Sequence, residues 1–433
     1  MAKMIYQKKK TIPFKFGDKH IEYIRNCTCN TYNIAEGAVR AGKTIDNVYA
    51  FAHELSDTPD KIHLATGSTS ANAKLNIGDA NGFGLEYIFR GQCRWGKYKG
   101  NECLIINGPS TGYKQKVVIF AGAALANSFK KIRGNSYGMW IATEVNLHHD
   151  DTIKEAFNRT LASRHRKFFW DLNPDHPRAN IYTEYIDKYI EKQKNGEMLG
   201  GVNYEHFTIF DNINISKASR DAFISQYEKG SIWYQRDIEG RRCVAEGLVY
   251  PMFRREKHVV SVVPNFNPHH RYYLSIDYGT VNPFAVGLYD YDPNEQTATM
   301  IKELYYRGGS DKRVDNEAYY KMLLQLVGDL QITYLIIDPS ASSMIETIQK
   351  YGKFIVVKAD NDVLNGIQDV TKYLNAGVLK FNSCCEETFS EFGVYRWDDK
   401  SDEDKVIKEN DHSMDQIRYF CRTVLRSELQ WII

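Results

Sequence analysis

An octet near the N-terminus constrains this chain more than any other feature. Residues 37–44 read Gly-Ala-Val-Arg-Ala-Gly-Lys-Thr and match the pattern G-x-x-x-x-G-K-[ST] at every fixed position. Gly37 and Gly42 let a loop bend until several backbone N–H groups converge on phosphate oxygens. Lys43 would then reach the β- and γ-phosphates of a nucleotide, and the Thr44 hydroxyl would ligate Mg²⁺. The octet therefore predicts a nucleotide-binding loop.

The residues around this loop have the expected context. A short strand at 32–35 precedes it, and a helix at 45–52 follows it, whose N-terminus adds partial positive charge to the phosphate cradle. Arg40, inside the loop, is a further expected phosphate contact. Other strands are predicted at 62–66, 116–121, 138–142 and 168–170, and helices at 179–194 and 216–236. This alternation predicts an α/β domain with a mainly parallel sheet.

Bulk composition excludes several classes of protein. The chain has 433 residues, enough for two or three domains, and a net charge of +2 that does not by itself require a nucleic-acid partner. Its eight cysteines show no paired spacing typical of a zinc site. No signal peptide, lipidation motif or apolar run of about 18 residues is evident. We expect reduced thiols in a cytosol and no association with a membrane.

The sequence pattern changes near residue 240. Glycines, a proline and an Arg-Arg pair mark residues 241–267 as a linker between a first domain at 1–240 and a second at 268–433. The second domain opens with three consecutive strands at 272–277, 284–289 and 297–306. A helix at 315–328, a strand at 332–338 and a last helix from His412 follow.

A phosphate loop needs an acidic partner strand that polarises the attacking water. The apolar run 138–142 ends in Thr143-Glu144, where Asp-Glu would be usual, so Glu144 is the expected general base. Thr143 carries no charge, which leaves the Mg²⁺ affinity and the ATP turnover open. Asn173 could sense the γ-phosphate, although the residues alone favour a strand-to-loop Asn-Pro turn. Arg133 is either an arginine that stabilises transition-state charge or a solvated surface residue.

The second domain carries its own set of acidic residues. Asp277 and Asp338 each close an apolar strand, where a carboxylate is costly unless something binds it. His412 and Asp415 are three residues apart, so both would lie on one face of the last helix. Together these four groups have the chemistry of two-metal phosphodiester hydrolysis with Mg²⁺ or Mn²⁺. Each Asp taken alone could instead form a turn or cap a helix.

In this combination the chain resembles the large terminase subunit of tailed bacteriophages and prophages, a DNA-packaging motor. The similarity spans nearly the whole chain and depends on the order and spacing of six motifs. These are GAVRAGKT at 37–44, GMWIATE at 138–144, LNPD at 172–175, SIDYGT at 275–280, LIIDPS at 335–340 and DHSMDQIRY at 411–419. The resemblance implies a P-loop ATPase of the ASCE type followed by a nuclease of ribonuclease H-like fold.

The resemblance also implies roles for individual residues. Glu144 matches the catalytic glutamate and Asn173 the coupling motif. Arg133 matches an arginine finger that acts on the ATP of a neighbouring subunit. The nuclease triad would be Asp277, Asp338 and Asp415, with His412 as an additional ligand. No adenine-contacting glutamine is evident before the loop, so the adenine contacts stay open.

The implied activity is ATP-driven translocation of double-stranded viral DNA into a procapsid, with cutting of concatemeric DNA by the nuclease. The implied partners are double-stranded DNA, the small terminase subunit and the portal protein, in the cytoplasm of a bacterial host. A homo-oligomeric ring would form on the portal, and a monomer in solution is compatible with this. One alternative is an ATP-dependent repair or recombination nuclease, and another is a scaffold that binds ATP without hydrolysing it. The sequence does not determine the packaging strategy (cos or headful) or the cleavage preference.

Overall fold

The computed structural model describes residues 14–227, 229–261, 266–279, 283–307 and 314–429. Residue 228 of a predicted helix, residues 262–265 of the predicted linker and Thr280 of a motif lie outside these ranges. The chain divides into two compact units. Unit 1 comprises the residues up to Ile224 together with Tyr234–Cys243, and unit 2 comprises Ser225–Trp233 and the residues from Val244 onward.

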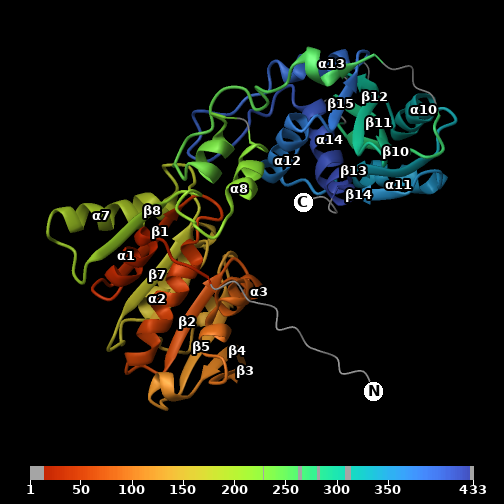
Figure 1. Ribbon diagram of the computed structural model, residues 1–433. Coiled ribbons are helices and arrows are strands. Elements are labelled where there is room, and N and C mark those ends of the chain that lie inside the picture. The colour runs from red at the N-terminus through yellow and green to blue at the C-terminus, as the bar shows by residue number, and fades with distance from the viewer. Residues whose placement is uncertain (1–13, 228, 262–265, 280–282, 308–313, 430–433) are drawn as a thin grey trace, which may run out of the picture. The chain divides into compact units, whose positions relative to one another are not determined.

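Unit 1 contains an eight-stranded sheet with helices on both faces (Figure 1). The strand order is β3-β4-β5-β2-β6-β7-β1-β8, and only β3 and β4 run antiparallel to their neighbours. The strands are β1 (Tyr32–Gly37), β2 (Ile62–Gly67), β3 (Cys93–Tyr98), β4 (Asn101–Ile106), β5 (Lys116–Gly122), β6 (Met139–Ala142), β7 (Lys167–Leu172) and β8 (Val202–Phe207). The predicted parallel sheet is therefore confirmed.

Unit 1 has several helices that were not predicted, and one predicted helix is contradicted by the structure. They are α1 (Asp18–Asn26), α2 (Lys43–Asp57), α3 (Ser70–Ala73), α4 (Leu85–Ile88), α5 (Phe129–Ile132), α6 (Asp150–Arg159), α7 (Asp187–Lys194) and α8 (Lys217–Ile224). Short 3₁₀- or π-helical turns are η1 (Lys74–Asp79), η2 (Ala80–Gly82), η3 (Pro109–Thr111), η4 (Val145–Leu147), η5 (Ile181–Ile186) and η6 (Tyr234–Ile238). The prediction of one helix over 216–236 is wrong in its middle, because α8 ends at Ile224 and Gly230 adopts a left-handed φ of 87°.

Strand β7 shows how the alternation of side chains assigns residues to the two faces of the sheet. Phe168 and Trp170 pack into the core cluster on one face, which includes residues of α6 and η5. Phe169 points to the other face and packs edge-on against Phe51 of α2, with ring centroids 5.6 Å apart. Because successive side chains alternate, Asp171 faces the same side as Phe169. This is the side on which α2 begins with the last two residues of the phosphate loop.

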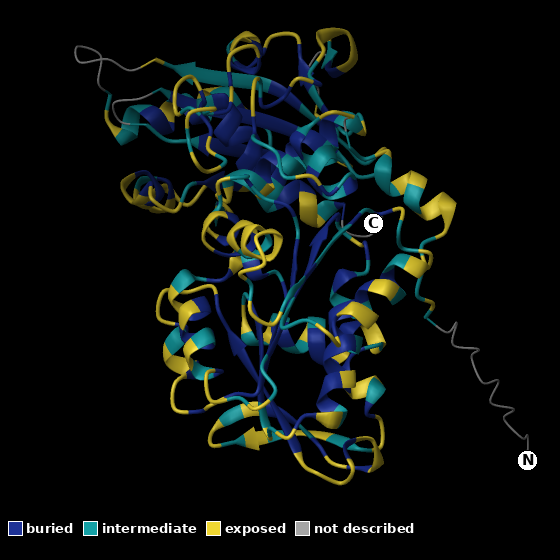
Figure 2. Cartoon of the chain, turned by 90° about the vertical axis from the view of Figure 1, so that its left-hand side faces the viewer, coloured by how far each residue is buried: buried dark blue, intermediate teal, exposed yellow. Residues whose placement is uncertain are grey.

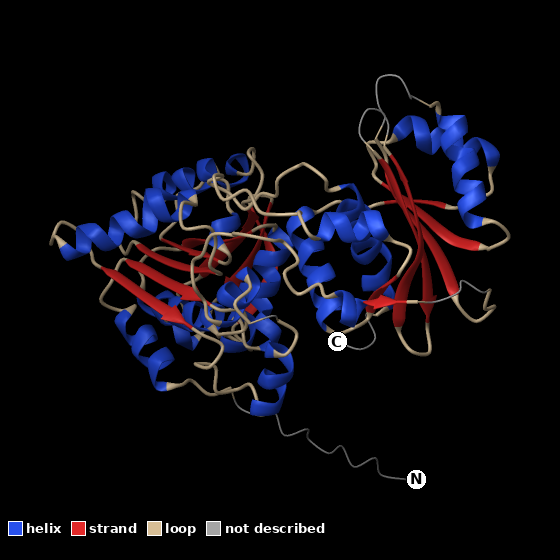
Figure 3. Cartoon of the chain, turned by 90° about the horizontal axis from the view of Figure 1, so that it is seen from above, coloured by secondary structure: helices blue, strands red, loops and turns tan. Residues whose placement is uncertain are grey.

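Unit 2 contains a seven-stranded mixed sheet, also covered by helices on both sides (Figure 3). The strand order is β14-β13-β10-β11-β12-β15-β9, with β10, β11 and β12 forming the predicted antiparallel meander. The strands are β9 (Val259–Val260), β10 (Arg271–Asp277), β11 (Phe284–Asp292), β12 (Thr297–Tyr306), β13 (Ile332–Ile337), β14 (Val356–Lys358) and β15 (Leu379–Asn382). The helices are α9 (Arg255–His258), α10 (Asn316–Val327), α11 (Ser342–Tyr351), α12 (Val363–Asn375), α13 (Glu386–Phe392), α14 (His412–Phe420), η7 (Cys421–Leu425) and α15 (Arg426–Glu428).

The strands of both sheets are largely buried (Figure 2). In unit 2, strand β10 contacts a packed layer on each face of the sheet. Leu274 and Ile276 belong to the core cluster formed with α10 and α11. Ser275 points the other way, where its hydroxyl donates to the Gln416 carbonyl of α14 at 2.6 Å. Asp277 follows the same alternation as Ser275 and therefore lies on the α14 side.

Much of the segment predicted as a linker, 241–267, is part of unit 2. Strand β9 pairs with β15, and the Phe253 ring stacks on the Phe392 ring of α13 with centroids 4.1 Å apart. Tyr250 is buried as well. The aromatic residues in this segment account for the difference, because they supply apolar surface that a linker would expose to water.

Candidate functional site

Both fixed glycines of the phosphate loop are required by the backbone. Gly37 has a φ of 146°, and a Cβ there would lie 1.8 Å from the carbonyl oxygen of Phe207. Gly42 has a φ of 100°, and a Cβ there would approach the His20 ring to 3.1 Å. The loop is also anchored, since the Ala38 N–H donates to the Phe207 carbonyl at 2.8 Å. The sequence pattern thus corresponds to a tightly bent loop held against β8.

Lys43 is buried at the base of this loop. Its ammonium donates to the carbonyls of Gly37 and Ala38 at 2.8 and 2.6 Å, and to the Asn173 side-chain oxygen at 3.1 Å. Burial lowers the pKa of Lys43 to about 8, although the nearby charges of Asp171 and Glu36 oppose this shift. The structure therefore brings together the predicted phosphate-binding lysine and the predicted coupling residue.

A cavity of about 650 Å³ lies over the loop. Its lining includes six predicted site residues, namely Arg40, Gly42, Lys43, Thr44, Glu144 and Asn173. Glu144 follows β6 with a left-handed φ of 52°, which is uncommon for a residue with a side chain. Its backbone N–H is held by the Asp171 carboxylate at 3.1 Å. The expected general base is thus fixed at the edge of the nucleotide cavity.

Asp171 is a site residue that the sequence analysis missed. Its side chain lines the same cavity, and only 3% of the residue is exposed. One carboxylate oxygen accepts from the Thr143 hydroxyl at 3.2 Å as well as from the Glu144 N–H. Burial raises the pKa of Asp171 to about 6, against the opposing effects of the Glu144 N–H and of Lys43. The available signal was an acidic residue directly after the apolar run Phe168–Trp170.

Arg133 lies apart from the cavity described above. Its side chain pairs with Glu155 of α6 at 3.2 Å and lies over the Phe129 ring at 4.3 Å. It is not among the residues that line the cavity over the loop. Within its own unit, Arg133 is therefore not a partner of the phosphate loop.

A second polar cluster lies on the opposite face of the sheet, directly before the loop. Glu36 is buried at the end of β1, and the Arg242 guanidinium binds both of its oxygens, at 2.8 and 2.6 Å. The Arg242 guanidinium also lies 3.7 Å from the centre of the Tyr182 ring. The residues are 206 apart in the sequence, so no local pattern indicates this pair.

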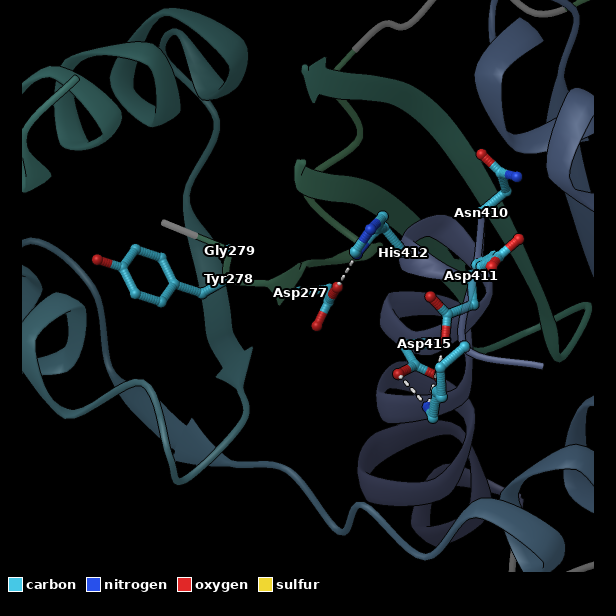
Figure 4. A pocket seen from close by; sticks show the side chains of 9 residues that line it. Asp277, Tyr278, Gly279, Asn410, Asp411, His412 and Asp415 are labelled. Atoms are coloured by element: carbon cyan, nitrogen blue, oxygen red, sulfur yellow. Dashed lines mark hydrogen bonds and ion pairs between the residues drawn. The ribbon is translucent and has the colours of Figure 1, made fainter. Parts of the chain in front are cut away.

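In unit 2, Asp277 and His412 contact each other directly. The His412 Nδ1 lies 2.8 Å from a carboxylate oxygen of Asp277, and Figure 4 shows the two side chains facing each other. Burial raises the pKa of Asp277, although His412 opposes this. For His412, burial lowers the pKa, but the hydrogen bond and charge of Asp277 outweigh it and raise the pKa overall. The hydrogen bond to Asp277 therefore favours the protonated form of His412.

Asp277, His412 and Asp415 line one cavity, which has a volume of about 570 Å³. The Asp415 carboxylate accepts from Arg418 at 2.9 Å and from Lys408 at 3.2 Å. Lys408 also pairs with Asp411 at 3.2 Å, and the charges of Asp415 and Asp411 raise its pKa in spite of burial. A lysine ammonium thus lies between two carboxylates that line this cavity.

Asp338 comes from the neighbouring strand but has different partners. The pairing of Ile276 with Ile337 sets Asp338 beside Asp277 at the ends of two parallel strands. Its carboxylate accepts from Asn361 at 3.0 Å and from the Tyr419 hydroxyl of α14 at 3.3 Å. Burial acts to raise its pKa, but hydrogen bonds from Ser340 and Asn361 dominate and lower it. Asp338 is not part of the lining of the 570 Å³ cavity.

The chemistry of these four groups suits a divalent cation, but Asp277, His412 and Asp415 are arranged in ion pairs, and Asp338 is held by hydrogen bonds from neutral groups. In the described residues, no three His, Cys, Asp or Glu side chains are grouped so that they could hold a metal. Oxygen donors dominate the set, which is the ligand type that Mg²⁺ and Mn²⁺ prefer. A cation bound to Asp415 would compete with the Lys408 ammonium for the same carboxylate.

Comparison with known proteins identifies the family. No family model matches the sequence, and no curated protein matches it. The chain is similar to the large terminase of a thermophilic bacteriophage, with 30% identity, a TM-score of 0.81 and coverage of 95% of this chain and 99% of that one. The chain belongs to the phage large terminase family. Structures of the same phage protein with ADP and with ATP-γ-S match at a TM-score of 0.78 each, also at 30% identity, over 95% of this chain and all of theirs.

Membership of this family confirms the predicted fold class. Unit 1 has the P-loop ATPase fold with a mainly parallel sheet, and unit 2 has the ribonuclease H-like α/β fold. Across the described ranges, every helix is too short or too polar to cross a bilayer.

Proposed function

We propose that this chain is a packaging motor in which residues 1–240 hydrolyse ATP and residues 268–433 cut DNA. Hydrolysis would drive double-stranded viral DNA into a procapsid. The observation that carries the proposal is the shared cavity of Lys43, Thr44, Glu144 and Asn173 in a chain that matches a large terminase over nearly its whole length. The terminase of the thermophilic phage has been solved with ADP and with ATP-γ-S, which supports nucleotide as the ligand here.

In the ATPase cycle, each of these residues has a defined task. Lys43 would exchange its three protein acceptors for phosphate oxygens, and Arg40 would add a second phosphate contact. Mg²⁺, held by Thr44, would neutralise phosphate charge. Glu144 would accept a proton from the attacking water. Asn173 would lose its hydrogen bond from Lys43 when phosphate binds, and this loss would change the conformation of the loop that follows β7.

The nuclease would use the acidic groups of unit 2. Asp277, Asp338, Asp415 and His412 would hold two Mg²⁺ or Mn²⁺ ions, which activate water and stabilise the leaving oxygen in such sites. His412 and Asp277 would orient one another through their hydrogen bond. Contacts to DNA would be made to phosphates and would not depend on sequence, because a motor must hold any genome.

Family membership also supports a set of partners. The chain would act with double-stranded DNA, a small terminase subunit and the portal protein, as a homo-oligomeric ring in the cytoplasm of the host. In such a ring Arg133, which lies outside the cavity of its own subunit, would reach the ATP of a neighbouring subunit.

Two substitutions test the two activities separately. Glu144→Gln should lower ATP turnover by at least about 10²-fold while nucleotide still binds. Asp338→Ala should abolish Mn²⁺-dependent cutting of DNA while ATP hydrolysis survives. Equal cutting by Asp338→Ala would contradict the nuclease assignment, and unchanged turnover in Glu144→Gln would mean that another group is the base. Stimulation of hydrolysis by a portal–procapsid complex would then separate a motor from a repair nuclease, which should not respond to the portal.

A further inference from the structure

Thr143 cannot supply the charge that the end of β6 normally carries in a P-loop ATPase. Its side chain is neutral, and 1% of the residue is exposed. Its hydroxyl is already engaged, because it donates to Asp171 at 3.2 Å and lies 3.5 Å from the Asn76 amide. The ATPase cavity therefore needs its carboxylate from another position.

Strand register brings Asp171 to that position. Strand β7 pairs with β6 through Trp170 and Ala142, so Asp171 and Thr143 are the next residues on two neighbouring parallel strands. Asp171 also pairs with Ala35 of β1, the strand that leads into the phosphate loop. The carboxylate thus lies between the strand of the loop and the strand of the catalytic glutamate.

The contacts of Asp171 link the working parts of the site. The Thr44 hydroxyl, which is the expected Mg²⁺ ligand of the loop, acts to lower the pKa of this carboxylate, and both groups line the same cavity. The carboxylate also accepts the backbone N–H of Glu144. The charge of Lys43 acts on Asp171, but within the described residues no lysine or arginine forms an ion pair with it. A buried carboxylate whose hydrogen bonds come only from neutral donors is costly, so the site favours a bound cation.

The donor set fits Mg²⁺. A carboxylate and a hydroxyl supply hard oxygen donors at one wall of a water-accessible cavity, and Mg²⁺ in nucleotide sites is bound by one or two such groups together with phosphates and waters. Lys43 shares the cavity but is directed to Gly37, Ala38 and Asn173.

We propose that Asp171 provides the carboxylate that holds the nucleotide's Mg²⁺ beside Thr44, in place of the residue at position 143, and that it fixes Glu144 through its backbone N–H. This inference rests on the proposed ATPase function. It moves the metal-facing charge from β6 to the neighbouring strand β7.

The variant Asp171→Asn tests this proposal because it removes the negative charge and keeps an oxygen that can still accept from Thr143 and from the Glu144 N–H. Binding of a fluorescent ADP analogue to the full chain should be measured with Mg²⁺ and with EDTA. In the wild type, Mg²⁺ should strengthen binding. In Asp171→Asn this gain should fall by at least about tenfold, the scale expected when support of a metal is removed, while affinity in EDTA is unchanged. Asp175→Asn, four residues further along, makes the same chemical change outside the cavity lining and should keep the gain.

A double variant tests whether the charge itself is what matters. Thr143→Asp combined with Asp171→Asn returns the carboxylate to β6 and should restore the Mg²⁺-dependent gain. Retention of the full gain in Asp171→Asn, or no recovery in a folded double variant, would overturn the inference. A wild type that binds no nucleotide would instead overturn the proposed function.

A crystal structure of the wild type with Mg²⁺ and ATP-γ-S gives a test that needs no variant. The inference predicts the Asp171 carboxylate either on the metal, at about 2.1 Å, or one metal-bound water away. A metal whose ligands and waters do not contact Asp171 would refute it, whatever the folding of the variants.

Discussion

The ion pair between Arg242 and Glu36 makes the stability of unit 1 depend on one guanidinium. The Glu36 side chain is 1% exposed, and it also accepts from the Tyr204 hydroxyl at 2.9 Å. Arg242→Gln would remove both charge-assisted bonds and leave a buried carboxylate with neutral donors only. Breaking a buried pair in this way costs about 3–5 kcal/mol. We expect the free energy of unfolding of unit 1 to decrease by that amount.

A matched control is available on the same guanidinium. Arg242 also binds Asp187 at 2.6 Å, but the Asp187 side chain is 51% exposed. Asp187→Asn should therefore cost no more than about 1 kcal/mol, as is usual for exposed pairs. Adding Glu36→Gln to Arg242→Gln removes the buried carboxylate that has lost its arginine, so the double variant should be more stable than Arg242→Gln alone.

Hydrogen exchange of peptides from β1 and β8 against urea reports the unfolding of unit 1 separately from that of unit 2. For a unit of this size the urea slope is about 3 kcal/mol per M, so Arg242→Gln should lower the midpoint by about 1–1.7 M. A shift as small as that of Asp187→Asn would refute the reasoning, because it would mean that Glu36 is satisfied without the arginine.

Two further predictions concern the same unit. Gly37→Ala should lower both nucleotide affinity and the melting temperature, because its Cβ would lie 1.8 Å from the Phe207 carbonyl oxygen, and an unchanged melting curve would contradict this. Burial lowers the pKa of His63 to about 3 from its ordinary 6.5. Between these pH values the unfolded chain binds a proton that the folded chain does not. The contribution of His63 to the free energy of unfolding is therefore complete above pH 6.5 and falls by about 1.4 kcal/mol per pH unit below it. The stability of the wild type relative to His63→Gln should therefore decrease from about pH 7 to about pH 5, and a constant difference would argue against a neutral buried histidine.

Elements with a strong local signal were predictable from the sequence. The phosphate loop could be predicted because its glycines are required by local backbone geometry that a short motif encodes. The meander of unit 2 could be predicted because β10, β11 and β12 are neighbours in sequence as well as in the sheet. The hairpin of β3 and β4 was missed, although Lys99 and Gly100 at its turn both adopt positive φ and Gly at such a turn is a recognised signal.

Groups that depend on distant partners were not predictable in this way. The pairing of Glu36 with Arg242 joins residues in different elements, and the contact of Asp338 with Tyr419 joins a strand end to the last helix. The ion pair of Lys408 with Asp415 was missed for a related reason, since nothing in the sequence shows that the lysine turns toward the acidic groups.

Both cavities follow one rule, and its limit explains the residue that was missed. Polar side chains lie at the carboxyl ends of neighbouring parallel strands, one residue beyond each apolar run, and the alternation of side chains turns them to the same face. In unit 2 this sets Asp338 beside Asp277. In unit 1 it sets Asp171 beside Thr143. The rule identifies the edge of the sheet, but only the pairing of β6 with β7 shows that a neutral residue on one strand has a carboxylate next to it on the other. A missing charge in a motif is therefore no sign of a missing activity until the neighbouring strand has been inspected.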